Sequence, residues 1–240
     1  MRIFLAGASG AIGQRLAPLL LGEGHAVTGT TRSPGKAGAL KAAGVEPVVV
    51  DVFDRAALLA AVVRARPEVV IHQLTDLPDV LEPAHLADWL MRNSRLRIEG
   101  TANVVAAAQA AGARRLIAQS IAFAYAAGPE PHGEDDPLAP TEGDAPGVTT
   151  ARGVRALEDA VLNTRGIDGI VLRYGRLYGP GTWNTPNARA PLHVDAAAHA
   201  ALLAVTRGSP GAYNIAEEDG AVTIDKARRE LGFDPAFRLK

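Results

Sequence analysis

The stretch Arg2-Ile3-Phe4-Leu5-Ala6-Gly7-Ala8-Ser9-Gly10-Ala11-Ile12-Gly13 decides the fold. Residues 2–6 are mostly apolar and predict a short buried strand, and three glycines spaced three residues apart follow at once. Gly7 permits a tight turn, Gly10 lets the backbone approach a phosphate, and Gly13 lets the next helix pack on the sheet. The start of that helix offers unpaired N–H groups and a positive dipole end to an anion. The stretch therefore predicts a loop that binds a dinucleotide pyrophosphate through Gly7, Ser9, Gly10, Ala11, Ile12 and Gly13.

Strand and helix signals then alternate along most of the chain. Predicted strands cover residues 2–6, 26–30, 48–50, 69–71, 116–118, 167–174 and 212–215. Predicted helices cover residues 12–21, 34–43, 55–65, 85–111, 150–164, 195–206 and 224–231. This alternation predicts an α/β fold of the Rossmann type, a doubly wound parallel sheet with helices on both faces. We expect residues 1–175 to form the NAD(P)-binding domain and residues 176–240 a reduced substrate-side subdomain that interleaves with it.

Composition narrows the class of protein. The 240 residues carry a formal net charge of -1, so no strong field favours nucleic acid or an anionic membrane. The absence of cysteine excludes disulfides, thiolate metal sites and a cysteine nucleophile, and we expect no metal. We see no apolar run of the ~20 residues that a membrane span needs and no signal peptide, so we expect a cytoplasmic protein without a membrane partner.

The end of the second strand predicts which cofactor binds. NAD-binding proteins usually place an acid there for the ribose 2′-hydroxyl, whereas this chain has Thr30-Thr31-Arg32-Ser33. Arg32 can bind a 2′-phosphate with Lys36 beside it, and the alternative is an exposed arginine at a strand end. Asp51 follows the third strand, where it either meets the adenine or caps the next helix. We therefore expect NADP as the cofactor, with NAD possible.

A set of motifs along the chain resembles the NAD-dependent epimerase/dehydratase family, the extended and atypical short-chain dehydrogenase/reductases. The matching segments are residues 7–13, 51–52, 70–74, 100–104, 120–125, 172–181, 193–195, 213–215 and 230–235. The resemblance implies a Rossmann domain with the nicotinamide near the ends of the fifth and sixth strands. It adds Val52 and Leu74 to the cofactor site and makes Tyr178 a candidate wall for the nicotinamide.

The family's catalytic Tyr-x-x-x-Lys pair is missing here. Tyrosines stand at 125, 174, 178 and 213 and lysines at 36, 41, 226 and 240, so no pair has that spacing. Alignment through Leu157-Glu158 puts Thr150 at the tyrosine position and Val154 at the lysine position. We take Tyr125 and Ser120 as the substitute catalytic candidates. The alternatives are an aromatic ring packed under the following loop and a strand-end serine bonded to the backbone.

Two further features bear on the substrate. His72 and His193 are interpreted as structural, and His132 is a proton-donor candidate in the acidic loop of residues 126–148, which is either a lid or a solvated connection. Few residues separate Gly181 from His193, where family members insert segments that grip nucleotide sugars. A large nucleoside-diphosphate sugar is therefore disfavoured.

Three functions remain open on the sequence. The first is an NADP-linked oxidoreductase or epimerase-like enzyme that acts on a small carbonyl or hydroxyl compound. The second is a non-catalytic NADP-binding sensor or regulatory protein, and the third is a scaffold in a complex. We favour the enzyme and expect a homodimer, paired through the helices at 85–111 and 150–164, with close approach at the alanines of residues 106–108 and 110–111.

Overall fold

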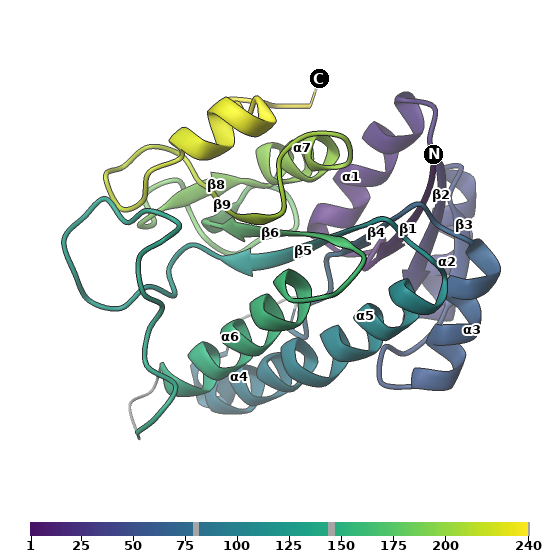
Figure 1. Cartoon of the computed structure of the whole chain (residues 1–240), viewed down its shortest axis with the longest axis horizontal. Helices are drawn as coiled ribbons and strands as arrows, with labels where there is room; N and C mark the ends of the chain where they lie inside the picture. The colour runs from purple at the N-terminus through teal and green to yellow at the C-terminus, as the bar shows by residue number, and fades with distance from the viewer. Residues whose placement is uncertain (79–81, 144–146, 240) are drawn as a thin grey trace.

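The sheet of the computed structural model, which describes residues 1–78, 82–143 and 147–239, confirms the predicted fold class. Its seven strands are all parallel and lie in the order β3-β2-β1-β4-β5-β6-β9 (Figure 1). They are β1 (Arg2–Ala6), β2 (Ala26–Thr31), β3 (Glu46–Val49), β4 (Val69–His72), β5 (Arg115–Ile121), β6 (Asp168–Tyr174) and β9 (Gly211–Ile215). The order reverses between β1 and β4, and ligands of such sheets bind beyond the carboxyl ends of the strands at this point.

Helices cover both faces of the sheet. They are α1 (Ala11–Gly22), α2 (Pro34–Ala42), α3 (Arg55–Ala65), α4 (Leu86–Arg95), α5 (Thr101–Ala110), α6 (Val148–Leu162) and α7 (Val194–Ala204). In Figure 1, α1 and α7 lie on one side of the sheet and α4, α5 and α6 on the other. Two buried apolar clusters follow this division, one centred on α1 and α7 and one on α3, α5 and α6. Local signals set the helix ends: Asp54 caps α3 by accepting from the Ala57 N–H, and Arg66 ends it with a left-handed φ of 46°.

The long helical segment predicted at 85–111 is present from Leu86 to Ala110, but its middle turn is π-helical. A 3₁₀ turn, η1 (Pro83–His85), precedes α4, and a π-helical turn, η2 (Leu96–Gly100), separates α4 from α5. A π turn inserts one extra residue into the helical repeat, so it changes which side chains face the sheet. Residue 97 is buried as a result, although it is an arginine. The helix predicted at 224–231 is helical from residue 225, and its last five residues form the π-helical η3 (Ala227–Leu231).

Residues 176–240 contribute both to the core and to a small addition beside it. Two short strands that the sequence did not predict, β7 (Arg176–Tyr178) and β8 (Pro191–His193), pair with each other in a separate sheet. By contrast, β9 extends the main sheet and α7 packs against α1. The main sheet therefore contains strands from both sides of residue 175, and the division into two domains stays a prediction.

The acidic loop packs over the carboxyl ends of β6 and β9. The Asn214 N–H donates to Glu134 Oε1 at 2.8 Å, and Arg173 Nη1 donates to the Glu134 carbonyl at 2.9 Å. His132 stands beside Asp136, with its Nδ1 3.0 Å from a carboxylate oxygen. Residues 144–146 of the predicted loop lie outside the described residues. No described helix is long and apolar enough to cross a membrane.

Candidate active site

A cleft of about 980 Å³ runs along the carboxyl ends of the strands. Its lining comes from the glycine loop, the ends of β2, β4, β5 and β6, the helical segment α4–η2, the start of α6 and the segment after β6. We call the part at Arg32 and Lys36 the β2 end. We call the part at Arg97, Ser120, Phe123 and Thr150 the β5 end. The volume lies at the upper limit of ordinary ligand pockets, as a dinucleotide together with a small second molecule requires.

The glycine loop has the shape of a phosphate cradle. Gly7 has a φ of +92°, and a Cβ there would lie 2.8 Å from the Gln73 carbonyl oxygen. A Cβ at Gly13 would overlap the Gly7 carbonyl oxygen, so this glycine permits the close packing of α1. A Cβ at Gly10 would meet only the Gly7 oxygen, at 3.4 Å, and would otherwise occupy the space over the loop. No side chain caps the α1 N-terminus, so its first N–H groups stay available to an anion.

At the β2 end, one carboxylate lies between two arginine side chains. Asp76, in the segment after β4, lies 3.1 Å from Arg32 Nη2 through one oxygen and 3.7 Å from Arg92 Nε through the other. Its backbone N–H donates to Asn93 Oδ1 at 2.9 Å. Lys36, at the start of α2, also lines the cleft. The β2 end thus carries two cations where a 2′-phosphate is expected, one of them bound to a competing carboxylate.

A buried charge network lies beneath the β5 end. Ser120 Oγ donates to Glu158 Oε1 at 2.7 Å, and Arg173 binds both oxygens of Glu158, at 2.7 and 3.0 Å. Arg173 also donates to the Tyr125 hydroxyl at 2.8 Å, and this hydroxyl donates to Asn214 Oδ1 at 2.7 Å. Burial is the largest influence on Tyr125 and raises the pKa of its hydroxyl. The network fixes the ends of β5, β6 and β9 relative to α6.

Arg97 and His72 are the buried basic groups next to this network. Arg97 is 8% exposed and lines the cleft, and burial lowers the pKa of its guanidinium to about 10. Burial, followed by the charge of Arg97, lowers the pKa of His72 to about 4. His72 Nδ1 accepts from the Leu74 N–H at 3.2 Å, so its Nε2, 3.0 Å from Thr101 Oγ1, carries the proton of the neutral ring. His72 is therefore neutral near pH 7 and Arg97 is charged.

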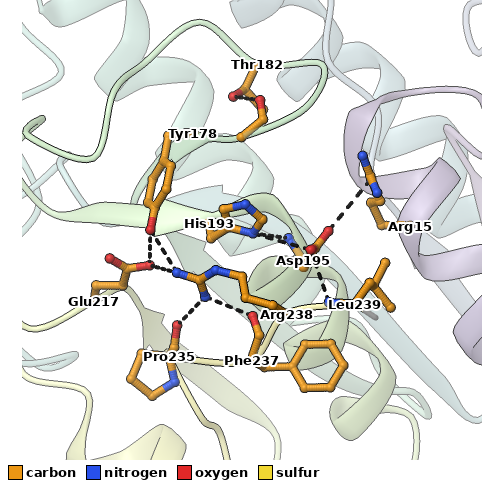
Figure 2. A network of polar contacts seen from close by, with 11 residues as sticks. Arg15, Tyr178, Thr182, His193, Asp195, Glu217, Pro235, Phe237, Arg238 and Leu239 are labelled. Carbon is orange, nitrogen blue, oxygen red and sulfur yellow. Dashed lines mark hydrogen bonds and ion pairs between the residues drawn. The ribbon is translucent and has the colours of Figure 1, made fainter.

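The wall formed by residues 176–184 is anchored from behind by the C-terminal segment (Figure 2). The Tyr178 hydroxyl donates to Glu217 Oε1 at 2.7 Å and accepts from Arg238 Nη2 at 2.8 Å. The next residue, Leu239, donates its N–H to Asp195 Oδ2 at 3.1 Å. Tyr178 is not among the described residues that line the cleft, and its hydroxyl joins the wall to the C-terminal segment.

Comparisons with known proteins identify the family of this chain. The model of the NAD dependent epimerase/dehydratase family matches residues 3–209. The chain belongs to the NAD dependent epimerase/dehydratase family. A curated relative, the 3-diazoavenalumate denitrifying reductase of a Streptomyces species, is 40% identical over 263 aligned residues, which cover all of this chain and 84% of that protein. As a member of this family, the chain is an NAD(P)-binding protein of the oxidoreductase and epimerase type.

Solved structures of low sequence identity share the fold. UDP-glucose 4-epimerase from Thermotoga maritima, solved with UDP-glucose, superimposes with a TM-score of 0.80 at 18% identity, covering 99% of this chain and 94% of that chain. Yeast methylglyoxal/isovaleraldehyde reductase, solved with NADPH, gives a TM-score of 0.78 at 16% identity and covers 98% and 94% of the two chains. These matches establish the Rossmann-type architecture of the epimerase/dehydratase family for the chain as a whole.

Most of the residues predicted to bind the cofactor lie along the cleft. Lining residues from the prediction are Gly7, Ser9, Gly10, Ala11, Ile12, Arg32, Lys36, Val52, Leu74 and Ser120. Gly13 lies under the loop, while Asp51, Tyr125 and Tyr178 are not among the described lining residues. Asp51 instead accepts from the Phe53 N–H at 2.9 Å in a local turn. The roles predicted for these residues stay predictions, and the contacts of Tyr125 match its alternative, structural interpretation.

Reasoning from the sequence missed several polar residues of the cleft. Asp76, Arg97 and Arg176 line it and were not predicted as site residues. No local sequence pattern marked Arg97 as a site residue. In a helix predicted without interruption over 85–111, the sequence does not show which way the Arg97 side chain points. Thr150 lines the cleft at the position aligned with the family's tyrosine, while Val154 is buried beside Ile121 and Ala124.

Proposed function

We propose that this chain is an NADPH-dependent reductase of small, electron-poor molecules, with an aryl diazo compound as its substrate class. The observation that carries the proposal is the chemistry of the cleft. The glycine loop and two cationic side chains, which suit phosphate groups, line one part of it, and the β5 end has no good proton donor among its described residues. Such a site suits hydride transfer that needs no acid.

The residues of the cleft fit a nicotinamide dinucleotide phosphate. The glycine loop and the α1 N-terminus would hold the pyrophosphate, and Arg32 with Lys36 would hold the 2′-phosphate. When bound in its reduced form, the cofactor supplies a hydride. The preference for NADP over NAD belongs to this proposal and rests on the two cations at the β2 end.

The hydroxyl groups at the β5 end are poor acids. Ser120 has committed its hydrogen to Glu158, and Thr150 has an ordinary aliphatic hydroxyl. Burial raises the pKa of the Tyr174 hydroxyl, which accepts from Gln73 Nε2 at 3.3 Å. No Asp, Glu, His or Lys lines this end within the described ranges. Carbonyl reduction requires a proton on the product oxygen, so this lining favours another acceptor.

Removal of a diazo group by hydride is a reduction that needs no proton donor. An arenediazonium ion takes up hydride, a C–H bond replaces the C–N bond, and the electron pair of the broken bond leaves with dinitrogen. The products are the arene and dinitrogen, and no proton enters the overall balance. The name of the 40%-identical relative describes such a reaction, the reductive loss of nitrogen from a diazo-bearing carboxylate.

The test uses NADPH that carries deuterium on its hydride-bearing carbon. We expect the protein to accelerate dinitrogen release from para-diazobenzoate, with deuterium at the former diazo carbon of the benzoate product. The matched control is Gly10→Val, because a side chain there occupies the phosphate cradle. Binding of NADPH without acceleration over this control would refute the proposal.

A non-catalytic NADP sensor is the second candidate function, favoured by the absence of a Tyr-x-x-x-Lys pair from the sequence. It predicts tight cofactor binding with no oxidation of NADPH by diazo compounds, aldehydes or ketones. The same assay therefore separates the two functions.

We also propose a cytoplasmic homodimer that pairs through α4, η2 and α6. Met91 is 56% exposed and Ile98 is 44% exposed, one heptad apart on this surface. The alanine face inferred from the sequence is less suitable, because Ala107 and Ala108 are buried against the sheet. Light scattering should show a dimer that Ile98→Asp converts to a monomer. Val63→Asp on α3, where the side chain is 42% exposed, should leave the dimer intact.

A further inference from the structure

Arg97 is a mostly buried arginine that has no partner among the described residues. It lies in the π-helical turn η2 and is 8% exposed, yet it makes no hydrogen bond and has no carboxylate within 4.0 Å among the residues that the structure describes. Three other arginines at or near the cleft are paired: Arg32 and Arg92 share Asp76, and Arg173 binds Glu158. An unpaired buried charge is costly, so Arg97 calls for an anion that the described chain does not supply.

The local structure directs this charge into the cleft. A Cβ at Gly153 on α6 would lie 3.3 Å from Arg97 Cδ and 2.8 Å from Ser94 Oγ, so the glycine makes room for the arginine stem. Glu158 is a buried carboxylate whose charge acts on Arg97, but its oxygens are occupied by Arg173 and Ser120. The guanidinium lines the cleft at its β5 end, together with Thr150.

The opposite wall adds an aromatic ring and a second cation. Arg176 of β7 lies with its Cζ 4.1 Å from the centre of the Phe123 ring, and both line the cleft. Arg176 likewise has no carboxylate within 4.0 Å among the described residues. Five cationic side chains and one carboxylate line the described cleft as a whole. A ring that bears a negative charge complements this end better than a neutral molecule.

We propose that Arg97 binds the carboxylate of an aromatic substrate by a bidentate contact. The proposal rests on the proposed reductase for the identity of the reaction and adds the charge of its substrate. It distinguishes Arg97 from the cations at the β2 end, because Arg97 serves the substrate and not the cofactor. A planar carboxylate matches the two parallel donors of a guanidinium, whereas a lysine offers only a point charge.

The experiment measures binding and does not depend on turnover. Cinnamate and its neutral amide, cinnamamide, are titrated by calorimetry into the protein saturated with NADP⁺. We expect cinnamate to bind about 10- to 100-fold more tightly than cinnamamide. Hydrogen bonds to a charged group stabilise a complex more than neutral hydrogen bonds do, by about this factor in Kd. Arg97→Met should abolish the difference and Arg97→Lys should restore part of it. Arg92→Met, which removes a charge that Asp76 already neutralises, should retain the difference.

Controls separate this role from the alternatives. Arg97→Met should fold with an unchanged or higher Tm, because an apolar side chain of similar size replaces an unpaired buried charge. Its affinity for NADP⁺ should also be unchanged, and a loss would assign Arg97 to the cofactor and overturn the proposal. Equal binding of acid and amide, or no binding of cinnamate at millimolar concentrations, would overturn it as well.

The outcomes for the proposed reductase are distinct. One outcome is that cinnamate binding depends on Arg97 but the protein does not reduce diazo compounds. This result would support the anion subsite and refute the proposed reductase function. Equal rates on diazo arenes with and without a carboxylate would remove the anion subsite and leave the reductase standing.

Discussion

Replacement of Arg32 by alanine tests the cofactor assignment most directly. A charge-assisted contact between a guanidinium and the 2′-phosphate stabilises the complex by roughly 1.5–3 kcal/mol. Arg32 must first leave Asp76, 3.1 Å away, and an exposed ion pair of this kind stabilises by about 0.2–1 kcal/mol. The net preference for NADPH over NADH is therefore about 1–2 kcal/mol, or roughly 5- to 30-fold in Kd.

The structure supplies two matched variants for this measurement. Arg32→Ala should weaken NADPH binding by about 5- to 30-fold and leave NADH binding nearly unchanged. Asp76→Asn should do the opposite and tighten NADPH binding about 2- to 5-fold, because the competing carboxylate is gone. Arg64→Ala, at an exposed position on α3 outside the cleft, controls for the loss of one positive charge. Fluorescence titration of each variant with both cofactors measures the four constants, and equal affinities of the unmodified protein for NADPH and NADH would refute the reasoning.

The remaining predictions concern the loop, the buried network and acid stability. Gly10→Val should abolish cofactor binding without lowering Tm, since its side chain enters the phosphate space and meets little protein; unchanged affinity by calorimetry would contradict this. Tyr125→Phe should leave kcat within a few-fold and lower the unfolding free energy by about 1–3 kcal/mol, because Asn214 loses its partner; a ~10²-fold loss of kcat would instead make Tyr125 the acid. His72 should make the protein less stable as the pH falls from its ordinary pKa of 6.5 towards about 4, because the unfolded chain then binds a proton that the folded chain excludes. Urea unfolding across this range should show up to ~3 kcal/mol of loss, and His72→Gln should flatten the profile.

Local patterns predicted the main sheet and the cofactor loop. The strands β1, β4, β5 and β6 contain short apolar runs that are buried, and each pairs in parallel with a neighbour on both sides, as the apolar runs predict for strands covered on both faces. The three glycines act within one turn, where Gly7 and Gly13 are required by backbone contacts that any side chain would violate. The strands β7 and β8 left no such pattern, because each has three residues and pairs only with the other.

Side-chain direction at the site could not be predicted in the same way. Tyr178 follows β6 as the sequence motif requires, but Glu217 and Arg238, distant in sequence, hold its hydroxyl away from the cleft. Ser120 is a predicted candidate because it ends the fifth strand, and Tyr125 because it follows that strand. The partners that bind them, Glu158 and Asn214, come from α6 and β9. These contacts depend on packing between distant segments, which a local pattern does not encode.

The missing proton donor and the unpaired Arg97 have a common consequence for the substrate. With Glu158 bound to Arg173, the buried groups Glu158, Arg173 and Arg97 carry a net positive charge, and His72 adds none because it is neutral near pH 7. A positive site would repel an isolated arenediazonium cation, whereas a carboxylate on the same molecule offsets that repulsion and fixes its orientation. The proposed subsite therefore favours the proposed chemistry: a diazo substrate is held better in this cleft when it also carries an anion within reach of Arg97. Substrates with both groups should be preferred over simple diazonium ions at low salt, where the repulsion is least screened.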